Sequence, residues 1–432
     1  MLAFNTLKHT LTTLRANDEG FISIHLPLSP ISLLAWLKAQ QQFPQIYLGD
    51  KNHQGEVACL GCAWQTDTAH IPATLSKARL YGGMGFSASS QWPDFPHCQF
   101  ILPRIEIRRQ GKINKLICNL YWAETDFATE INATLALLAN LSEPSKLDFQ
   151  PSQLISRQDL PNQNDWSKLV RHVTKASFQQ HTAKVVLSRQ TKLTLANAVD
   201  HHSLLHQWQA LNPNCFSFLI SWSAQAHFLG CTPERLYLRS GARLTTESLA
   251  GTMPRGSNQD DDQEYCEALL HQRKFKRENQ LVLEDILAHL KQVSYDIGLD
   301  TIGVLKLNHI QHLKQRIHAY LKPEANDYEL LSTLHPTPAV GGTPRENALQ
   351  FINQHEPYQR GWYAGAIGVL NQQQSQFAVA IRSALVRSNE VCLFAGAGIV
   401  KGSLPEHEWL ELEHKIATPL QLLTVSVNGK AP

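Results

Sequence analysis

A carboxylate on an apolar helix face is the first residue in this sequence whose type and position could support chemistry. In the single long helix predicted over residues 262–293, Glu278 shares one face with Val282, Ile286 and Leu290, at intervals of four residues. A carboxylate buried on such a face without a partner is costly, so we expect a counter-ion nearby. The pattern therefore indicates either an ion pair or a metal ligand at Glu278.

The closing helix, predicted over residues 405–423, carries a second acidic group. Glu408, Glu411 and Lys415 share one side of this helix, next to its apolar face, whereas Glu413 points the other way. One or two carboxylates, with water and substrate completing the octahedron, commonly hold Mg²⁺. A solvated helix face with an ion pair between Glu411 and Lys415 explains the same spacing. Spacing alone leaves both interpretations open.

Three further charged residues lie on or beside predicted strands. Lys184 opens the apolar strand KVVLS, and Glu234 follows a proline at a strand-to-turn junction in CTPERLYL. A lysine desolvated at a strand end can act as a base, and a partly buried glutamate can act as an acid. Arg382 is expected in mid-strand in FAVAIRSAL, either as an edge charge or as a buried guanidinium that binds a carboxylate. Taken singly, each of these residues is more often structural.

Small residues in two segments would let a ligand approach the backbone closely. The segment LFAGAGIVKGS contains Gly396 and Gly398, but its glycines do not fit the GxGxxG pattern of dinucleotide sites. In SLAGTMPRG, the backbone amides around Gly251 could receive a carboxylate. A simple turn explains the glycine of this second segment equally well.

The elements that must position these residues alternate between strand-like and helical patterns. Polar residues and prolines accumulate in residues 142–165, and we place a boundary there between an N-terminal lobe, 1–155, and a C-terminal domain, 156–432. Residues 377–400 are predicted to form a β-hairpin with its turn at Ser388 and Asn389. Periodicity predicts an α/β chain but does not decide whether its sheets are parallel or antiparallel.

Composition excludes several classes of protein. A chain of 432 residues with 43% hydrophobic and 18% charged residues is typical of a globular protein. Its 39 Lys and Arg against 37 Asp and Glu form no basic stripe, so no nucleic acid is expected as a partner. No apolar run approaches the roughly 20 residues that span a bilayer, so no membrane association is expected. Eight scattered cysteines, including a lone pair at Cys59 and Cys62, indicate reduced thiols in a cytoplasmic protein.

Taken together, eight segments resemble the chorismate-utilising enzymes, and they occur in the order of that family. The segments are AKVVLSR, GCTPERL, TTESLAGTMPRG, KRENQLVLEDI, LHPTPAVGGTPR, WYAGAIGVL, FAVAIRSA and FAGAGIVKGSLPEHEWLELEHK. They cover roughly residues 165–425. The resemblance implies an α/β (α+β) fold in which large antiparallel β-sheets form a sandwich flanked by helices, with the C-terminal domain as the chorismate-binding catalytic part.

Within the family, the sequence is most similar to the isochorismate synthases of the menaquinone pathway. Lys184 occupies the position at which water-using members carry a lysine and ammonia-using members carry a small residue. The N-terminal segments WLKAQQQFPQIYLGD and FILPRIEIRRQGK also resemble those enzymes. The resemblance implies that Lys184 is the base for water attack at C2 of chorismate and that Glu234 is the acid that protonates the departing C4 hydroxyl.

The resemblance also implies a metal site and a substrate site. Glu278 and Glu411 match ligands of Mg²⁺, with Glu408 beside them, and no redox cofactor is implied. Substrate-binding groups are implied at Gly251, Arg382, Gly396 and Lys415. The substrate is then the small molecule chorismate, and the protein is expected to be a monomer or a homodimer.

Two positions depart from the family, and three other functions stay open. Phe275 stands where some members have a carboxylate, which predicts weaker Mg²⁺ binding. Pro338 stands where the family varies between small and larger residues, in a loop that the resemblance places at the ring pocket, so Lys184 does not by itself settle the nucleophile. The alternatives are a salicylate synthase, an aminating synthase for anthranilate or aminodeoxychorismate, and a non-catalytic chorismate-binding subunit. The presence of Lys184 argues against the aminating enzymes.

Overall fold

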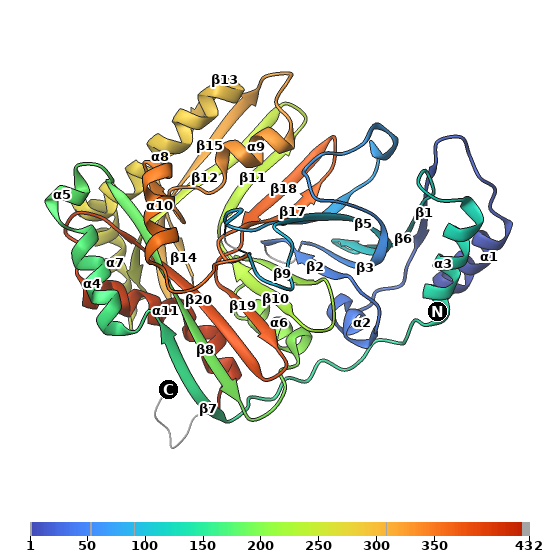
Figure 1. The fold of residues 1–432 in the computed structure, drawn as a ribbon, viewed down its shortest axis with the longest axis horizontal. Helices are drawn as coiled ribbons and strands as arrows, with labels where there is room; N and C mark the ends of the chain where they lie inside the picture. The colour runs from blue at the N-terminus through green and yellow to red at the C-terminus, as the bar shows by residue number, and fades with distance from the viewer. Residues whose placement is uncertain (1, 52–53, 90, 308, 426–432) are drawn as a thin grey trace.

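A computed structural model describes residues 2–51, 54–89, 91–307 and 309–425 of the chain. Over these residues, 20 strands join through antiparallel pairings into one continuous hydrogen-bonded system, and helices pack on its outer faces (Figure 1). The predicted α/β architecture of large antiparallel sheets flanked by helices is therefore confirmed. Among the described residues, no helix combines the length and apolar character needed to cross a membrane.

The N-terminal elements form a small layer of strands with helices at its margin, on the right of Figure 1. They are α1 (Leu2–Thr13), β1 (Phe21–Pro27), α2 (Leu33–Ala39), β2 (Gln45–Gly49), β3 (Gly55–Thr66), a 3₁₀ turn (Ala73–Leu75), β4 (Leu80–Met84), β5 (Cys98–Gln110), β6 (Ile113–Tyr121) and α3 (Phe127–Ala139). An extended stretch without helix or strand then leads to β7.

The remaining elements build the larger part of the molecule, and most of its helices lie on the left of Figure 1. The first group is β7 (Leu154–Leu160), α4 (Gln163–Val173), α5 (Ala176–Gln179), β8 (Lys184–Leu195), α6 (His201–Ala210), β9 (Phe216–Ser221), β10 (His227–Thr232), β11 (Arg235–Ser240), β12 (Arg243–Pro254), α7 (Gln259–His271) and α8 (Arg273–Val293). The second group is β13 (Ser294–Leu299), β14 (Gly303–Lys306), β15 (Ile310–Leu321), α9 (Asp327–Leu334), β16 (Gly342–Thr343), α10 (Arg345–His355), β17 (Ala366–Leu370), β18 (Gln374–Val379), β19 (Ser383–Arg387), β20 (Glu390–Ile399) and α11 (Pro405–Leu423).

Strand pairing joins the two sides of the predicted boundary at residue 155. β2 pairs with β9, where Tyr47 lies opposite Leu219, and β4 pairs with β17, where Gly82 lies opposite Gly368. The N-terminal strands thus continue the sheet of the C-terminal part. The division into lobes 1–155 and 156–432 stays a prediction.

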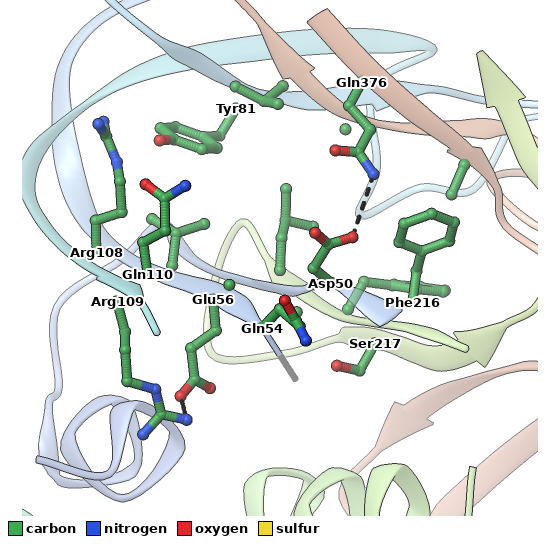
Figure 2. Close-up of a pocket in the computed structure, with 18 of the residues that line it drawn as sticks. Asp50, Gln54, Glu56, Tyr81, Arg108, Arg109, Gln110, Phe216, Ser217 and Gln376 are labelled. Atoms are coloured by element: carbon green, nitrogen blue, oxygen red, sulfur yellow. Dashed lines mark hydrogen bonds and ion pairs between the residues drawn. The ribbon is translucent and has the colours of Figure 1, made fainter. Parts of the chain in front are cut away.

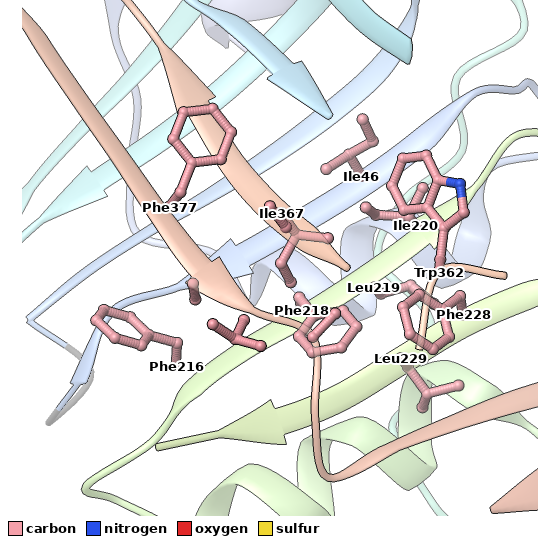
Figure 3. Close-up of a cluster of buried hydrophobic side chains, with 14 of the residues drawn as sticks. Ile46, Phe216, Phe218, Leu219, Ile220, Phe228, Leu229, Trp362, Ile367 and Phe377 are labelled. Atoms are coloured by element: carbon pink, nitrogen blue, oxygen red, sulfur yellow. The ribbon is translucent and has the colours of Figure 1, made fainter. Parts of the chain in front are cut away.

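Buried apolar side chains fill the space around this junction (Figure 3). Ile46 of β2, Phe218 of β9, Phe228 of β10 and Ile367 of β17 are each at most 2% exposed, and Trp362 packs beside them. Burying a side chain of this size contributes roughly 1.5–3 kcal/mol. The hydrophobic core is therefore continuous from the N-terminal strands into the C-terminal part.

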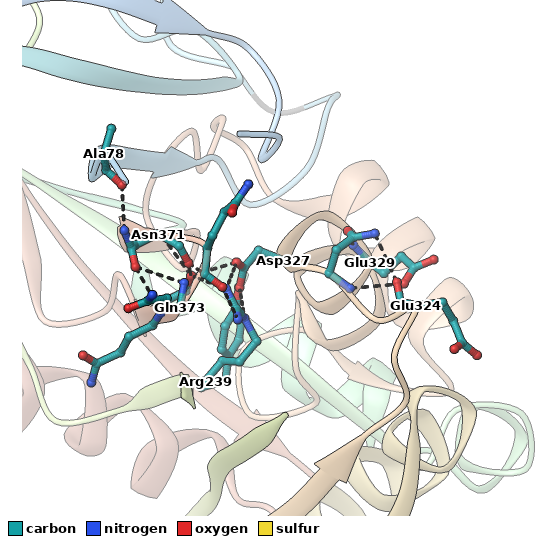
Figure 4. A network of polar contacts seen from close by, with 12 residues as sticks. Ala78, Arg239, Glu324, Asp327, Glu329, Asn371 and Gln373 are labelled. Carbon is teal, nitrogen blue, oxygen red and sulfur yellow. Dashed lines mark hydrogen bonds and ion pairs between the residues drawn. The ribbon is translucent and has the colours of Figure 1, made fainter. Parts of the chain in front are cut away.

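A network of polar side chains anchors α9 to the sheet (Figure 4). Arg239 of β11 binds Asp327 with two hydrogen bonds, from Nη2 to Oδ2 at 2.6 Å and from Nε to Oδ1 at 3.1 Å. Tyr237 and Ser375 donate to the same carboxylate at 2.9 and 2.7 Å. Because every partner is buried, each hydrogen bond satisfies a group that would otherwise be costly to bury.

Most predicted elements are confirmed, but the long helix is divided. The predicted hairpin turns at Ser388, but its first strand begins at Ser383, because residues 377–379 belong to β18. The closing helix spans the predicted residues. The predicted helix over residues 262–293 was wrong as a single element, because Gln272 is extended (ψ 135°) and separates α7 from α8. α7 packs against β12, β14 and β15, and α8 continues along β12, β13 and β15.

Candidate active site

One pocket between the sheet and the helices α8 and α11 collects the residues that the sequence singles out. Its lining includes Glu234, Glu278, Arg382, Gly396, Glu411 and Lys415. Lys184 reaches the same pocket through its contact with Glu278, and Gly251 lies between the lining residues Ala250 and Thr252. All eight predicted positions, separated by up to 231 residues in the chain, thus meet in one place.

Lys184 and Glu278 form an ion pair at the base of this pocket. Lys184 is the first residue of β8 and only 1% exposed, and its Nζ donates to Glu278 Oε1 at 3.1 Å. Gly398 of β20 faces the pair, and a Cβ at this position would lie 2.8 Å from Lys184 Cε and overlap the Glu278 carboxylate. Only a glycine at position 398 leaves room for the side chains of Lys184 and Glu278 beside β20.

Glu234 lies in the connection between β10 and β11 and is 4% exposed. Burial, with a contribution from the nearby Glu247 carboxylate, raises the pKa of Glu234 to about 8, although Lys184 and Lys415 act in the opposite direction. Thr337 Oγ1 lies 3.5 Å from Glu234 Oε1. At neutral pH this carboxyl group is therefore mostly protonated, which is the state a general acid needs.

A second group of carboxylates lies where α8 and α11 approach each other. Glu411 Oε1 accepts a hydrogen bond from Lys415 Nζ at 2.5 Å, and Lys415 also donates to the Gly396 carbonyl at 2.8 Å. Glu408, one turn before Glu411, pairs with Lys274 of α8 at 2.8 Å. Burial and the nearby Glu411 raise the pKa of Glu408 to about 7, against the opposing effect of Lys274.

The donor set suits a hard cation. Among the described residues, no group of three or more His, Cys, Asp or Glu side chains is arranged as a complete metal site. Glu278 and Glu411 both line the pocket, and their partners are lysine side chains with flexible stems. Two carboxylate ligands with the remaining positions left to water and substrate fit Mg²⁺. They do not fit a structural zinc site, which needs four protein ligands.

Arg382 differs from the prediction, which placed it in mid-strand. It lies between β18 and β19 with a φ of 52°, because the chain turns there: Ile381 N bonds Val379 O, and Arg382 O accepts from Cys231 N. The Arg382 residue is partly buried, and among the described residues no ion pair joins its guanidinium to a carboxylate. Its Nη2 instead lies 3.3 Å from His312 Nε2.

His312 is the neutral neighbour of this guanidinium. Burial and the charge of Arg382 hold the pKa of His312 well below its usual value. A neutral imidazole can accept from the guanidinium without adding charge to the pocket. Arg382 lines the pocket, where its guanidinium can bind an anionic group.

Gly251 lies in a β-bulge and not in the simple turn that its sequence segment was also compatible with. β12 continues through it, with a register shift against β15 between Ala250 and Thr252, and Gly251 has a φ of +81°. Phe275 packs beneath it, since a Cβ on Gly251 would lie 3.3 Å from the Phe275 Cβ. The bulge redirects the backbone of Ala250 and Thr252 toward the pocket.

Two lining residues, Tyr363 and His312, were not identified from the sequence. The Tyr363 ring stacks on Phe394 with a centroid distance of 5.1 Å, and a Cβ on Gly396 would lie 2.8 Å from its hydroxyl oxygen. A single aromatic residue before a strand has no spacing that distinguishes it from a core residue. Its role as a wall of the pocket depends on how β17 and β20 are placed.

A larger cavity, of about 810 Å³, lies elsewhere and is lined by residues of β2, β3, β5, β9, β17 and β18 (Figure 2). Arg109 and Glu56 form an ion pair at its wall, and Gln376 donates to Asp50 at 3.4 Å. None of the eight predicted site residues lines it. The smaller pocket brings together Glu234, Lys184 and the carboxylates of Glu278 and Glu411. It is therefore the candidate active site.

Comparison with known proteins finds relatives along most of the chain. Residues 66–424 match the family described as chorismate binding enzyme. The chain is 35% identical over 422 residues to isochorismate synthase MenF of Escherichia coli, covering 96% of each chain. It is 33% identical over 399 residues to isochorismate synthase MenF of Pasteurella multocida, covering 91% of this chain and 90% of the relative.

A solved structure agrees with the sequence relatives. The structure of MenF, the menaquinone-specific isochorismate synthase from Escherichia coli, superposes with a TM-score of 0.91 and 33% identity. The match covers 98% of this chain and 99% of the other, so it includes the N-terminal strands as well as the pocket. The chain belongs to the chorismate binding enzyme family.

Proposed function

We propose that this protein is an Mg²⁺-dependent isochorismate synthase, which converts chorismate to isochorismate by water attack at C2 and loss of the C4 hydroxyl. The observation that carries the proposal is that two buried ionisable groups meet at one pocket: Glu234, whose pKa is raised by burial, and Lys184. An allylic displacement by water needs a base for the incoming water and an acid for the departing hydroxyl. The curated relatives and the similar solved structure carry the same enzyme name.

In this reaction the atoms balance without an oxidant or a second substrate. Lys184, in its neutral form, takes a proton from the attacking water as the bond from oxygen to C2 forms. The ring double bond shifts, the bond from C4 to oxygen breaks, and Glu234 gives its proton to the leaving hydroxide. The result is an isomer of the substrate and one released water, after which proton exchange with solvent restores both side chains.

The remaining residues of the pocket suit a dicarboxylate. The guanidinium of Arg382 and the ammonium of Lys415 supply positive charge, and the backbone at Gly251 and Gly396 allows close approach. Glu278 and Glu411 would hold Mg²⁺, which when bound neutralises and orients the ring carboxylate of the substrate. The positive charges of Arg382 and Lys415 are then available to bind the second carboxylate of the substrate.

We place the protein in the cytoplasm, as a monomer or homodimer that feeds menaquinone biosynthesis. The absence of a membrane-spanning helix among the described residues agrees with this location. The pathway follows from the name of the similar solved structure. Its eight cysteines are all unpaired, as expected of a reducing compartment.

The decisive experiment is chromatography of the products after incubation of purified protein with chorismate, with and without Mg²⁺ and ammonium. An isomer peak that requires Mg²⁺, without pyruvate and without incorporated nitrogen, is the expected result. Salicylate with pyruvate would replace the proposal with a salicylate synthase, and an aminated product would replace it with an ammonia-using synthase. Absence of turnover under all conditions would indicate a binding subunit.

A further inference from the structure

A lysine from the N-terminal strands reaches the backbone next to the proposed acid. Lys51 follows β2, and its Nζ donates to the carbonyl oxygen of Pro233 at 2.7 Å. The same ammonium lies over the ring of Phe216, 4.8 Å from the centroid, and its side chain is only 18% exposed. Pro233 directly precedes Glu234, so this contact fixes the peptide group that leads into the acid.

The residue on the other side of the acid is held as well. Glu247 of β12 is 3% exposed and accepts a hydrogen bond from the backbone N–H of Arg235 at 3.0 Å. Its carboxylate pairs with Lys314 of β15 at 2.6 Å and with Lys51 at 3.5 Å. Lys51 and Glu247 thus bracket the segment from Pro233 to Arg235 and contact each other.

The backbone of Glu234 itself is bound within the sheet. Its N–H points to Thr232 Oγ1 at 3.3 Å, and its carbonyl accepts from Val379 N at 3.0 Å. Each of these bonds holds one polar group of a peptide plane that flanks the acid. Lys51 and Glu247 bind the other polar group of each plane, the Pro233 carbonyl before the acid and the Arg235 amide after it.

We propose that Lys51 and Glu247 are positioning residues for Glu234, so that the N-terminal strands complete the acid side of the active site. This inference rests on the proposed function, because it assigns the acid to Glu234. Neither residue lines the candidate active site, so both act through the backbone of the acid. The N-terminal part then has a catalytic role besides packing.

Glu247 has a second effect through its charge. The ionisable groups that act on Glu234 are Glu247 from β12, Lys184 from β8 and Lys415 from α11, and Thr337 lies at its carboxyl group. Glu247 opposes ionisation of the acid, whereas the two lysines favour it. Replacing Glu247 with glutamine keeps an oxygen acceptor for the Arg235 amide and removes the charge.

The first test is Lys51→Met, measured as kcat and KM for chorismate in the full-length protein with Mg²⁺. Because a small displacement of a catalytic group is costly, we expect kcat to fall about tenfold while KM changes less than about twofold. Lys51→Arg, which keeps a charged donor, is expected to restore most of kcat. An unchanged kcat in folded Lys51→Met protein would overturn the inference.

Lys38→Met is the matched control for a general loosening of the N-terminal part. Lys38 of α2 also pairs with an acid, Asp200 at 2.6 Å, and donates to the Lys146 carbonyl at 2.7 Å, but it does not contact residues 233–235. We expect its kcat to stay within about twofold of the wild-type value. A loss equal to that of Lys51→Met would mean that Lys51 acts only through packing.

A second measurement asks whether Lys51 acts through the acid. In a Glu234→Gln background, Lys51→Met is expected to have less than about a twofold further effect on residual kcat, because coupled residues are not additive. A full tenfold loss in that background would overturn the inference. If residual turnover is too slow to measure, the pH profile of Glu247→Gln decides.

For Glu247→Gln, the alkaline limb of kcat/KM is expected to move to lower pH by roughly half a unit or more, because the pKa of Glu234 falls when a neighbouring negative charge is removed. If the alkaline limb of kcat/KM stays at the wild-type pH, Glu247 does not act on Glu234. Failure of the proposed function looks different, since wild-type protein would then not isomerise chorismate, or Glu234→Gln would keep full activity.

Discussion

Lys184 Nζ lies 3.1 Å from Glu278 Oε1, so the proposed base and a proposed metal ligand share one ion pair. The two residues come from β8 and α8, 94 positions apart in the chain. A cation bound by Glu278 would compete with the Lys184 ammonium for the same carboxylate. Metal binding is therefore expected to release the Lys184 side chain from this ion pair.

Removing the amine of Lys184 should abolish water addition. Lys184→Ala is expected to lower kcat by about 10²–10⁴-fold, the range typical of a lost general base, while chorismate still binds in the presence of Mg²⁺. Product chromatography and calorimetric titration measure the two effects. Lys192→Ala, at an exposed position of the same strand, is the control and should retain full activity. Near-normal turnover in Lys184→Ala would remove Lys184 from its role.

The pH profile should report the acid. With a pKa of about 8, Glu234 is protonated below that value and loses its proton as the pH rises through it. Because only the protonated form can donate to the leaving hydroxyl, kcat/KM is expected to fall on the alkaline side with a midpoint near pH 8. Initial rates at saturating Mg²⁺ across pH 6–10 measure it. A profile that stays flat through pH 9 would contradict this assignment.

Glu234 should also reduce the stability of the fold at alkaline pH. Its pKa is raised from about 4.5 to about 8 on folding, so between these values the unfolded chain binds fewer protons than the folded protein and stability falls as pH rises. Glu234→Gln is therefore expected to have a higher Tm than wild type at pH 8. The difference should shrink toward pH 4.5, which calorimetry at both pH values can measure; a difference independent of pH would exclude this linkage.

Loss of a metal ligand should weaken Mg²⁺ binding and substrate binding together. Glu278→Gln is expected to raise the Mg²⁺ concentration needed for half-maximal activity by roughly tenfold or more, and titration with Mg²⁺ should show the same loss without turnover. Glu284→Gln, at an exposed position of the same helix, serves as the control. An unchanged dependence on Mg²⁺ would mean that the cation binds elsewhere.

The network around Asp327 is expected to matter for stability rather than for catalysis. Asp327→Asn leaves the buried Arg239 guanidinium without its charged partner, which should lower the free energy of unfolding by about 3–5 kcal/mol. Denaturant titration measures this, and kcat of the folded fraction should stay unchanged. Asp300→Asn removes an exposed ion pair with Arg316 and should cost less than about 1 kcal/mol. Equal losses for the two variants would contradict the role of burial.

Local patterns in the sequence, together with its resemblance to a family, predicted eight residues of the pocket and the elements that carry most of them. The face shared by Glu278, Val282 and Ile286 follows from helical periodicity, which depends only on neighbours within a few turns. Lys184 and Glu234 were identified from ordered segments that resemble a family. The closing helix and the hairpin turn at Ser388 were also predicted where the structure has them.

Tertiary structure decided what these residues contact. The division at Gln272, the bulge at Gly251 and the turn at Arg382 depend on how strands and helices cross, which no local period encodes. The bracketing of Glu234 by Lys51 and Glu247 joins three segments far apart in the chain. Such contacts form only when the sheet closes with a particular register, because register is set by packing over the whole core. The raised pKa of Glu234 is likewise a property of its burial rather than of its neighbours in sequence.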